Sequence, residues 1–176
     1  QQQAEAALSK GATVLVLGSV DSEAAGQIVT SAQGSGAKVI SYDRLIKGES
    51  KPDYLVTFNN EYVGTLQAQS LMAEFDAQGV TDPRLIWING SSKTAESAVF
   101  EKGAKDAISD TTTIVKLGEM PGWKPEEAQQ LVEAQIASGG ADSFDGVLVA
   151  NDGGAGGVFA ALNAAGIDPR TKPTTG

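Results

Sequence analysis

Short apolar runs alternate with longer amphipathic stretches along most of the chain. The runs are rich in Val, Ile and Leu, which is typical of strands in a parallel sheet covered by helices on both faces. Between the runs, apolar residues recur near helical spacing, as Val63, Leu66, Leu71 and Phe75 do. The pattern predicts repeated β–α units and an α/β fold with parallel sheets. The predicted strands are residues 12–18, 38–42, 54–58, 84–89, 111–117 and 146–150. The predicted helices are an opening helix that ends at Gly11, residues 22–33, 61–78, 97–108 and 125–138, and a last helix that includes residues 158–165.

The alternation is broken once, where the predicted strands 38–42 and 54–58 follow one another with only a polar, Gly- and Pro-containing segment between them. The balance of charge changes near the same place. Residues 1–58 carry 5 basic and 6 acidic side chains, whereas residues 59–176 carry 8 and 16. We therefore expect part of one lobe over residues 1–58, most of a second lobe over residues 59–176, and a hinge near residues 57–60.

The composition excludes several classes of function. The chain has no His and no Cys, which excludes thiolate–imidazole metal sites and His-based catalytic triads. Its net charge of −9 argues against nucleic acid or an anionic membrane surface as a partner, because both require basic patches. No stretch approaches the roughly 20 apolar residues of a membrane span. We predict no metal, no cofactor and no nucleic-acid partner.

The first candidate site lies where the apolar run of residues 37–42 stops at Asp43 and Arg44. Open α/β sheets bind their ligands at the carboxyl ends of strands. An acceptor carboxylate beside a five-donor guanidinium suits a small polyhydroxylated ligand, whose hydroxyls both donate and accept hydrogen bonds. The alternative is that Asp43 caps a helix and Arg44 is merely solvated.

The second candidate site follows the predicted strand 146–150, where Asn151 and Asp152 precede the glycine-rich residues 153–157. Glycines at the start of a helix allow a ligand to approach the backbone and its unpaired N–H groups. Alternatively, they permit close packing of the helix on the sheet. We expect Asp152 to cap the helix and Asn151 to bind the ligand. A nucleotide site is not predicted, because Phe159 stands where the G-x-G-x-x-G pattern needs a third glycine.

The third candidate is Trp123, in a short loop bounded by Pro and Gly directly before a predicted helix. The flat face of a tryptophan suits the C–H face of a sugar ring, and its indole N–H is a donor. The alternative is an aromatic side chain packed into the surface of the lobe. Trp87 lies within a predicted strand, and we expect it to be structural.

The fourth candidate is the polar loop after the strand 84–89. Asn89, Thr94 and Glu96 are placed to reach a ligand at the edge of the sheet, whereas Ser91 or Ser92 is expected to cap the following helix.

An enzyme has little support in the sequence. Asp43 and Asp152 are a conceivable pair of carboxylates for acid–base chemistry. Arg44 beside Asp43, however, favours the charged form of that carboxyl, which suits an acceptor better than a proton donor. Nothing resembles an activated nucleophile, so we predict that the protein is not an enzyme.

Four motifs occur in order along the chain: ISYDR, TFNNEYVGTLQAQ, GWKPEEAQQLVEAQI and VLVANDGGAGG. Together they resemble the sugar-binding type 1 periplasmic proteins of ABC transporters, and among these the xylose-binding and multiple-sugar-binding branch. The resemblance implies two Rossmann-like lobes, joined by a hinge, that close around one monosaccharide. It further implies that Asp43 and Arg44 bind sugar hydroxyls from the first lobe, that Trp123 stacks on the ring, and that Asn151 binds hydroxyls from the second lobe.

The same resemblance implies a function for the full-length protein. We expect it to capture a monosaccharide, D-xylose or a related aldose, and to present it to an ABC permease, with a chemoreceptor as a further partner. The expected location is periplasmic or extracytoplasmic, reached by a signal peptide or by a lipoprotein signal that leaves a lipid anchor. The chain lacks an initiator Met and opens like the later turns of a helix, so we expect an internal fragment. The alternative function is the effector domain of a LacI-type transcription regulator.

Overall fold

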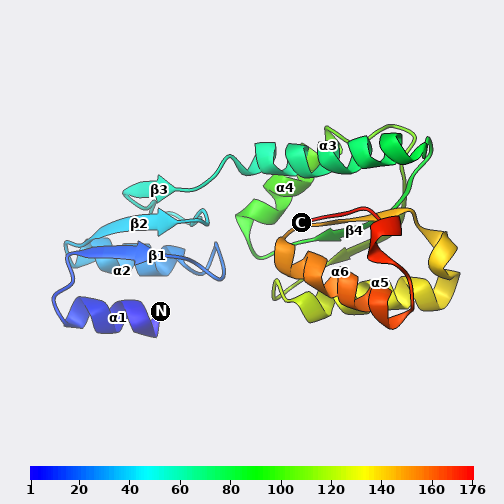
Figure 1. Cartoon of the computed structure of the whole chain (residues 1–176). Coiled ribbons are helices and arrows are strands. Elements are labelled where there is room, and N and C mark those ends of the chain that lie inside the picture. The colour runs from blue at the N-terminus through cyan, green and yellow to red at the C-terminus, as the bar shows by residue number, and fades with distance from the viewer. The chain divides into compact units, whose positions relative to one another are not determined.

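The computed structural model describes all 176 residues, which form two compact units. Unit 1 consists of Gln1–Asn59 and Lys93–Glu96, and unit 2 consists of Asn60–Ser92 and Ser97–Gly176. Each unit contains one parallel sheet with helices packed on it (Figure 1), so the predicted α/β class with parallel sheets is confirmed. The grouping of Lys93–Glu96 with unit 1 has no counterpart in the prediction from sequence.

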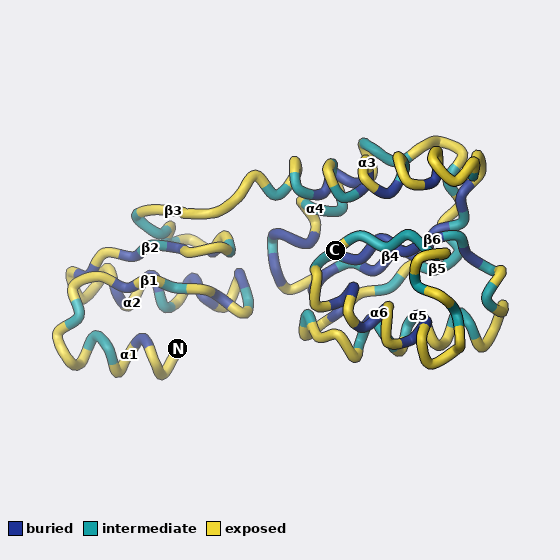
Figure 2. The backbone as a smooth tube through the Cα atoms, in the orientation of Figure 1, coloured by how far each residue is buried: buried dark blue, intermediate teal, exposed yellow.

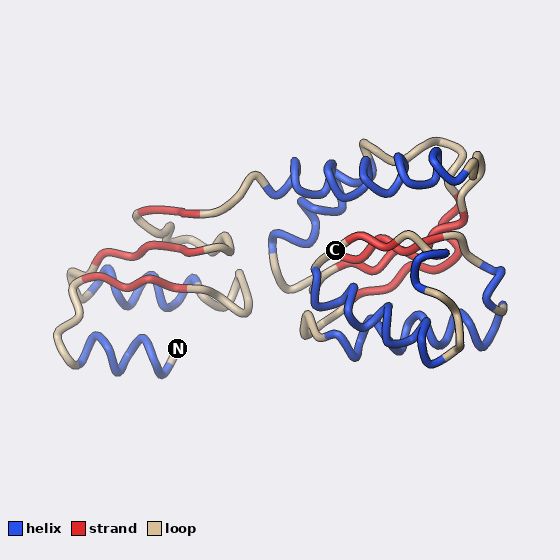
Figure 3. Tube along the Cα trace, viewed as in Figure 1, coloured by secondary structure: helices blue, strands red, loops and turns tan.

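The elements follow the predicted alternation of strands and helices (Figure 3). The strands are β1 (Val14–Leu17), β2 (Lys38–Tyr42), β3 (Tyr54–Val56), β4 (Arg84–Asn89), β5 (Thr113–Glu119), β6 (Gly146–Val149) and β7 (Thr174–Thr175). The helices are α1 (Gln2–Ser9), α2 (Gly26–Gly34), α3 (Asn60–Gln78), α4 (Ala95–Lys105), α5 (Pro125–Gly139) and α6 (Asp152–Ala164), with short 3₁₀ helices at Ala141–Ser143 and Pro169–Thr171. None of these helices combines the length and the apolar character that crossing a membrane requires.

The sheet of unit 1 has the order β1-β2-β3, and all its strands are parallel. Helices α1 and α2 pack on one face, where Leu15 and Val39 join the core. The other face is exposed to solvent (Figure 2). Val16 of β1 and Tyr54 of β3 both pair in register with Ile40 of β2, and they are 62% and 64% exposed. Both helices of unit 1 lie on the same side, so within this chain helices cover only one of the two faces that the sequence pattern predicts to be covered. Ile40, in the middle of β2, is only half-buried.

The sheet of unit 2 has the order β5-β4-β6-β7 and is covered on both faces. Ile86 and Ile88 of β4 face a core formed with α5 and α6, whereas Leu85 and Trp87 face a second core formed with α3. Trp87 is buried, as expected for a structural tryptophan. This sheet has the two-sided cover that its apolar strands predict.

Helix α3 packs on the sheet through a stripe that shares Leu71 and Phe75, but not Val63 or Leu66, with the one expected. Its buried residues are Gly64, Ala68, Leu71 and Phe75, whereas Leu66 is exposed. The expected stripe was chosen from the large side chains, but small residues form half of the real one. At Gly64, a Cβ atom would lie 2.1 Å from the carbonyl oxygen of Phe100 in α4, so the close approach of the two helices requires glycine there.

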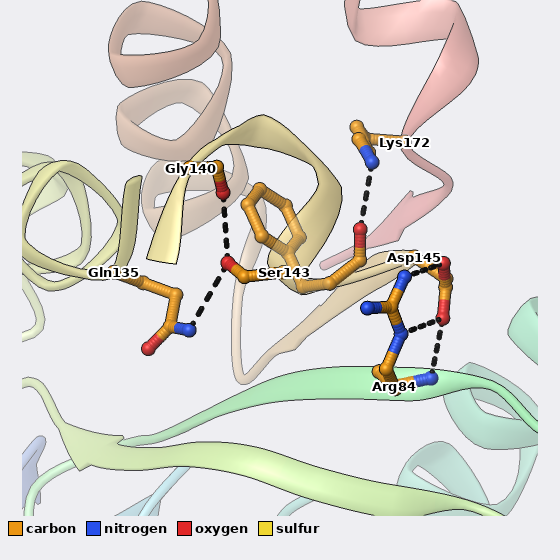
Figure 4. A network of polar contacts seen from close by, with 7 residues as sticks. Arg84, Gln135, Gly140, Ser143, Asp145 and Lys172 are labelled. Carbon is orange, nitrogen blue, oxygen red and sulfur yellow. Dashed lines mark hydrogen bonds and ion pairs between the residues drawn. The ribbon is translucent and has the colours of Figure 1, made fainter. Parts of the chain in front are cut away.

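A polar network joins the amino ends of β4 and β6 (Figure 4). The backbone N–H and the guanidinium of Arg84 donate hydrogen bonds of 2.7–3.0 Å to the carboxylate of Asp145. The side-chain hydrogen bond from Arg84 lowers the pKa of Asp145 below its usual value. Nearby, the ammonium of Lys172 donates a 2.7 Å bond to the carbonyl of Phe144. Because these contacts lie at the edge of the sheet opposite the carboxyl ends of the strands, we assign them a structural role.

Candidate functional site

Asp43 directly follows β2 and has a left-handed backbone, with φ of +67°. Its N–H donates to the carbonyl of Val56 at 2.8 Å, and its own carbonyl accepts from the hydroxyl of Thr57 at 2.6 Å. Non-glycine residues with positive φ are uncommon, and they persist where surrounding contacts enforce them, often at functional sites. No helix follows Asp43, since the chain continues as a loop to β3. The alternative that Asp43 caps a helix is therefore wrong.

The side chains of Asp43 and Arg44 provide an acceptor and donors at the carboxyl edge of the unit 1 sheet. The Asp43 side chain is 58% exposed, and its nearest charged neighbour is Arg44, whose Nε lies 4.0 Å from Oδ2. The Arg44 side chain is only 26% exposed, and its Nη1 donates a 3.1 Å bond to the carbonyl of Ser19, just after β1. Arg44 is thus oriented by the neighbouring strand end, while the Asp43 carboxylate faces solvent.

Trp123 also has a left-handed backbone, with φ of +57°. For a bulky side chain this conformation is a true outlier. The indole ring lies against Gly90, the residue after β4: a Cβ on Gly90 would be 2.0 Å from Cη2 of Trp123. The ring also makes an edge-to-face contact with Phe100, with centroids 6.5 Å apart. Trp123 is therefore held at the carboxyl edge of the unit 2 sheet, and it is only partly buried there.

The carboxylate of Glu127 fixes the turn that carries Trp123. It accepts hydrogen bonds from the N–H of Gly122 at 3.0 Å and from the N–H of Lys124 at 3.1 Å. Glu127 is the third residue of α5, and it forms a capping box with Lys124. In the sequence, Glu127 is an acidic residue two positions after the Pro that begins the helix, which is a signal for this arrangement.

Asn151, not Asp152, caps α6. The Asn151 Oδ1 atom accepts a 2.7 Å hydrogen bond from the N–H of Gly154, and Asp152 is the first helical residue. The expectation that Asp152 is the cap is therefore wrong. The side-chain oxygen of Asn151 is used in the helix cap. Its side-chain amide nitrogen remains as a donor at the carboxyl end of β6. Close packing explains two of the glycines that follow: a Cβ would lie 2.5 Å from Val149 at Gly154 and 2.0 Å from the Pro125 carbonyl at Gly157.

Asn89 is the last residue of β4, and its side chain is hydrogen-bonded within unit 2. Its Oδ1 accepts a 2.6 Å bond from the indole N–H of Trp87, and its Nδ2 donates a 3.1 Å bond to the carboxylate of Glu101. Both polar atoms of Asn89 thus have partners inside unit 2, which favours a structural role.

Thr94 and Glu96 belong to the segment that groups with unit 1, and both are buried. Helix α4 begins at Ala95, whose N–H donates a hydrogen bond to the hydroxyl oxygen of Ser22. The expectation that Ser91 or Ser92 caps this helix is therefore wrong, because both lie at least three residues before its start.

The sequence profile of the periplasmic binding protein domain family matches residues 1–176, which is the whole chain. The chain belongs to this family. Among curated proteins, this periplasmic binding protein domain is 30% identical over 170 residues to the D-xylose-binding periplasmic protein of Escherichia coli K12. The alignment covers 94% of the chain and 49% of the relative. It is 31% identical over 177 residues to a multiple sugar-binding periplasmic receptor of Rhizobium radiobacter, with 93% and 50% covered. The chain thus spans about half the length of these relatives.

Solved structures with the same fold include the Caulobacter myo-inositol binding protein bound to myo-inositol. It has a TM-score of 0.86 and 24% identity, with 98% of this chain and 58% of that chain covered. An ABC transporter solute binding protein from Clostridium phytofermentans with bound β-D-glucose has a TM-score of 0.81 and 29% identity, with 98% and 56% covered. The periplasmic binding protein fold predicted from the sequence motifs is therefore confirmed.

Proposed function

We propose that the chain is part of the sugar-binding component of an ABC transporter, which captures a monosaccharide for import. The ligand that we propose is D-xylose or a related aldose. The names of the curated relatives support a sugar, and they differ between D-xylose and multiple sugars. The bound molecules in the solved relatives, β-D-glucose and myo-inositol, are likewise small, ring-shaped and rich in hydroxyls.

One observation carries the proposal: Asp43 and Trp123 are the two non-glycine residues with positive φ, and each follows the carboxyl end of a parallel strand. Holding a residue in this conformation costs on the order of 1–3 kcal/mol, which surrounding contacts must offset. A solvated carboxylate with a guanidinium beside it suits hydroxyls, and a fixed indole suits the C–H face of a sugar ring.

In the proposed mechanism, each unit supplies one part of the ligand's surroundings. Asp43 and Arg44 bind sugar hydroxyls from unit 1, while Trp123 stacks on the ring and the Asn151 amide donates to a hydroxyl from unit 2. A hinge near residues 57–60 then closes the protein around the sugar and excludes water, as in other ligand-binding proteins with two lobes. Binding without chemical conversion makes the protein a receptor and not an enzyme.

The proposed partners follow from this role. An ABC permease in the membrane receives the loaded protein, a chemoreceptor is a further candidate, and the site of action is periplasmic or extracytoplasmic, with or without a lipid anchor. The alternative of a LacI-type effector domain has less support, since the relatives named above are sugar-binding proteins of the periplasm.

Isothermal titration calorimetry of the full-length protein tests the proposal. D-Xylose, D-glucose and myo-inositol are titrated separately into the wild type and into Arg44→Ala. We expect saturable heat with at least one aldose, and an affinity at least about tenfold lower for Arg44→Ala, because sugar hydroxyls would lose a charged donor inside a closed site. Arg170→Ala is the matched control, since Arg170 is exposed and pairs with Asp168. The absence of saturable heat with every sugar would contradict the proposal.

A further inference from the structure

Glu96 is a buried carboxylate with a single hydrogen-bond partner. It lies in the first turn of α4, groups with unit 1, and is 7% exposed. Its Oε1 accepts a 2.6 Å hydrogen bond from the backbone N–H of Leu45, whereas its Oε2 is buried without a hydrogen-bond partner. Burying a carboxylate is costly unless hydrogen bonds stabilise it. The bond from Leu45 is therefore the hydrogen bond that stabilises this buried carboxylate in unit 1.

Leu45 directly follows the two proposed sugar-binding residues, so the Glu96 carboxylate holds the end of their turn. The start of the turn is held by the backbone bonds of Asp43 to Val56 and Thr57. Its middle is held by the hydroxyl of Ser41, which donates a 2.5 Å bond to the carbonyl of Arg44. Without Glu96, the N–H of Leu45 would lose its acceptor, and the end of the turn would lose this contact.

Glu96 is itself fixed by the segment that carries it. The hydroxyl of the buried Ser22 accepts a 3.2 Å bond from the N–H of Ala95, and the Ser22 N–H donates a 3.2 Å bond to the carbonyl of Lys93. The Ser22 carbonyl in turn accepts a 2.8 Å bond from the N–H of Lys47, just beyond Leu45. One buried serine thus bonds both the segment of Glu96 and the loop of Leu45, which keeps the carboxylate aimed at that loop.

The geometry points to Glu96 as a positioning residue, which orients the Asp43–Arg44 turn for sugar binding and does not itself contact the sugar. This inference depends on the proposed function only in its assumption that the turn binds a sugar. The hydrogen bond between Glu96 and Leu45 does not involve the sugar. It replaces the expectation that Glu96 is a direct ligand.

Two variants and a control separate the possible roles of Glu96 in the full-length protein. Glu96→Ala removes the acceptor, while Glu96→Gln keeps an oxygen at the same position. Glu126→Ala is the matched control, since Glu126 is also in the first turn of a helix but is exposed. The first readout is hydrogen exchange of the Leu45 amide without sugar, measured against the Val39 amide, which bonds Asp53 in the same unit. The second is the affinity for D-xylose and D-glucose by calorimetry.

We expect Glu96→Ala to speed exchange at Leu45 at least about tenfold with little change at Val39, and to weaken sugar binding by a similar factor. Glu96→Gln should retain Leu45 protection and bind within about threefold of the wild type, and Glu126→Ala should change neither readout. Unchanged exchange at Leu45 in Glu96→Ala would overturn the inference. So would a Glu96→Gln variant that keeps Leu45 protected but loses sugar binding, because Glu96 would then be a direct ligand. If the wild type binds neither sugar, the proposed function fails for these sugars, and the Leu45 exchange still decides whether Glu96 holds the turn.

Discussion

The indole of Trp123 rests on the backbone of Gly90, at a distance that leaves no room for a side chain there. Gly90 follows β4, and Trp123 lies in the loop after β5, so the contact joins the ends of two adjacent strands. The position of the ring is therefore set by a glycine more than thirty residues earlier in the chain.

Gly90→Ala should move the Trp123 ring, because the new Cβ would lie 2.0 Å from Cη2. We expect sugar affinity to fall at least about tenfold, since displacement of a positioned group by about an ångström removes the benefit of its orientation. Calorimetry measures the affinity, and tryptophan fluorescence of the free protein reports the moved ring. The control is Gly156→Ala in α6, where a Cβ would meet nothing within 4 Å. Equal affinities for wild type and Gly90→Ala would show that the ring position does not matter for binding.

Glu127→Ala should loosen the turn around Trp123, because the N–H groups of Gly122 and Lys124 lose their acceptor. The expected loss is about 1–2 kcal/mol in the free energy of unfolding, as for hydrogen bonds to a charged group near the surface. Chemical denaturation of the full-length protein measures this quantity. Glu126→Ala, at the exposed neighbouring position, is expected to change it by less than about 0.5 kcal/mol. A similar loss in both variants would argue against a specific role for Glu127.

The ionisation of Asp53 makes the stability of unit 1 depend on pH. Its carboxylate accepts hydrogen bonds from Lys38 at 2.7 Å and from the backbone N–H of Val39 at 2.9 Å. These contacts, led by the side-chain bond from Lys38, lower the pKa of Asp53 from 3.8 to about 2. A carboxyl with a lower pKa in the folded state contributes stability above its unfolded pKa, and this contribution is lost as the pH falls from about 4 to about 2.

Asp53→Asn should therefore remove part of the acid dependence of stability, since an amide does not titrate in this range. Urea denaturation at a series of pH values between 2 and 6 measures the effect. The exposed Asp110 in unit 2 provides the control variant, Asp110→Asn. If Asp53→Asn and the wild type lose stability in parallel over this range, the ion pair with Lys38 contributes nothing measurable.

The sequence predicted the strands best where several apolar residues stand between clear breaks. Residues 38–42 and 84–89 were predicted with the bounds that β2 and β4 have. The two-residue β7 was missed, because Thr174 and Thr175 have no apolar pattern and join the sheet only through pairing with β6. The glycine-rich residues 153–157 were expected to open α6 after a cap at Asp152, although glycines disfavour a helix in isolation. Capping by Asn151 and close packing at Gly157 allow the helix there.

The candidate site was predicted only in part, for a physical reason. Asp43, Trp123 and Asn151 follow strand ends, and that position can be read from the order of elements. The contacts that orient them, such as Gly90 under the indole and Glu127 under the turn, join distant segments, and only tertiary packing brings them together. For the same reason the sequence suggested ligand roles for Asn89, whose two polar side-chain atoms bond Trp87 and Glu101, and for Glu96, one of whose carboxylate oxygens bonds Leu45.

The most direct test of sugar binding at this site is the tryptophan emission of the full-length protein during titration with D-xylose and D-glucose, compared between wild type and Trp123→Phe. If Trp123 stacks on the bound sugar, the wild type will show a saturable change in emission at the affinity measured by calorimetry. Trp123→Phe will lose that change and bind more weakly. An emission that stays flat while calorimetry records binding, or a Trp123→Phe variant that gives the same response as the wild type, would contradict the account.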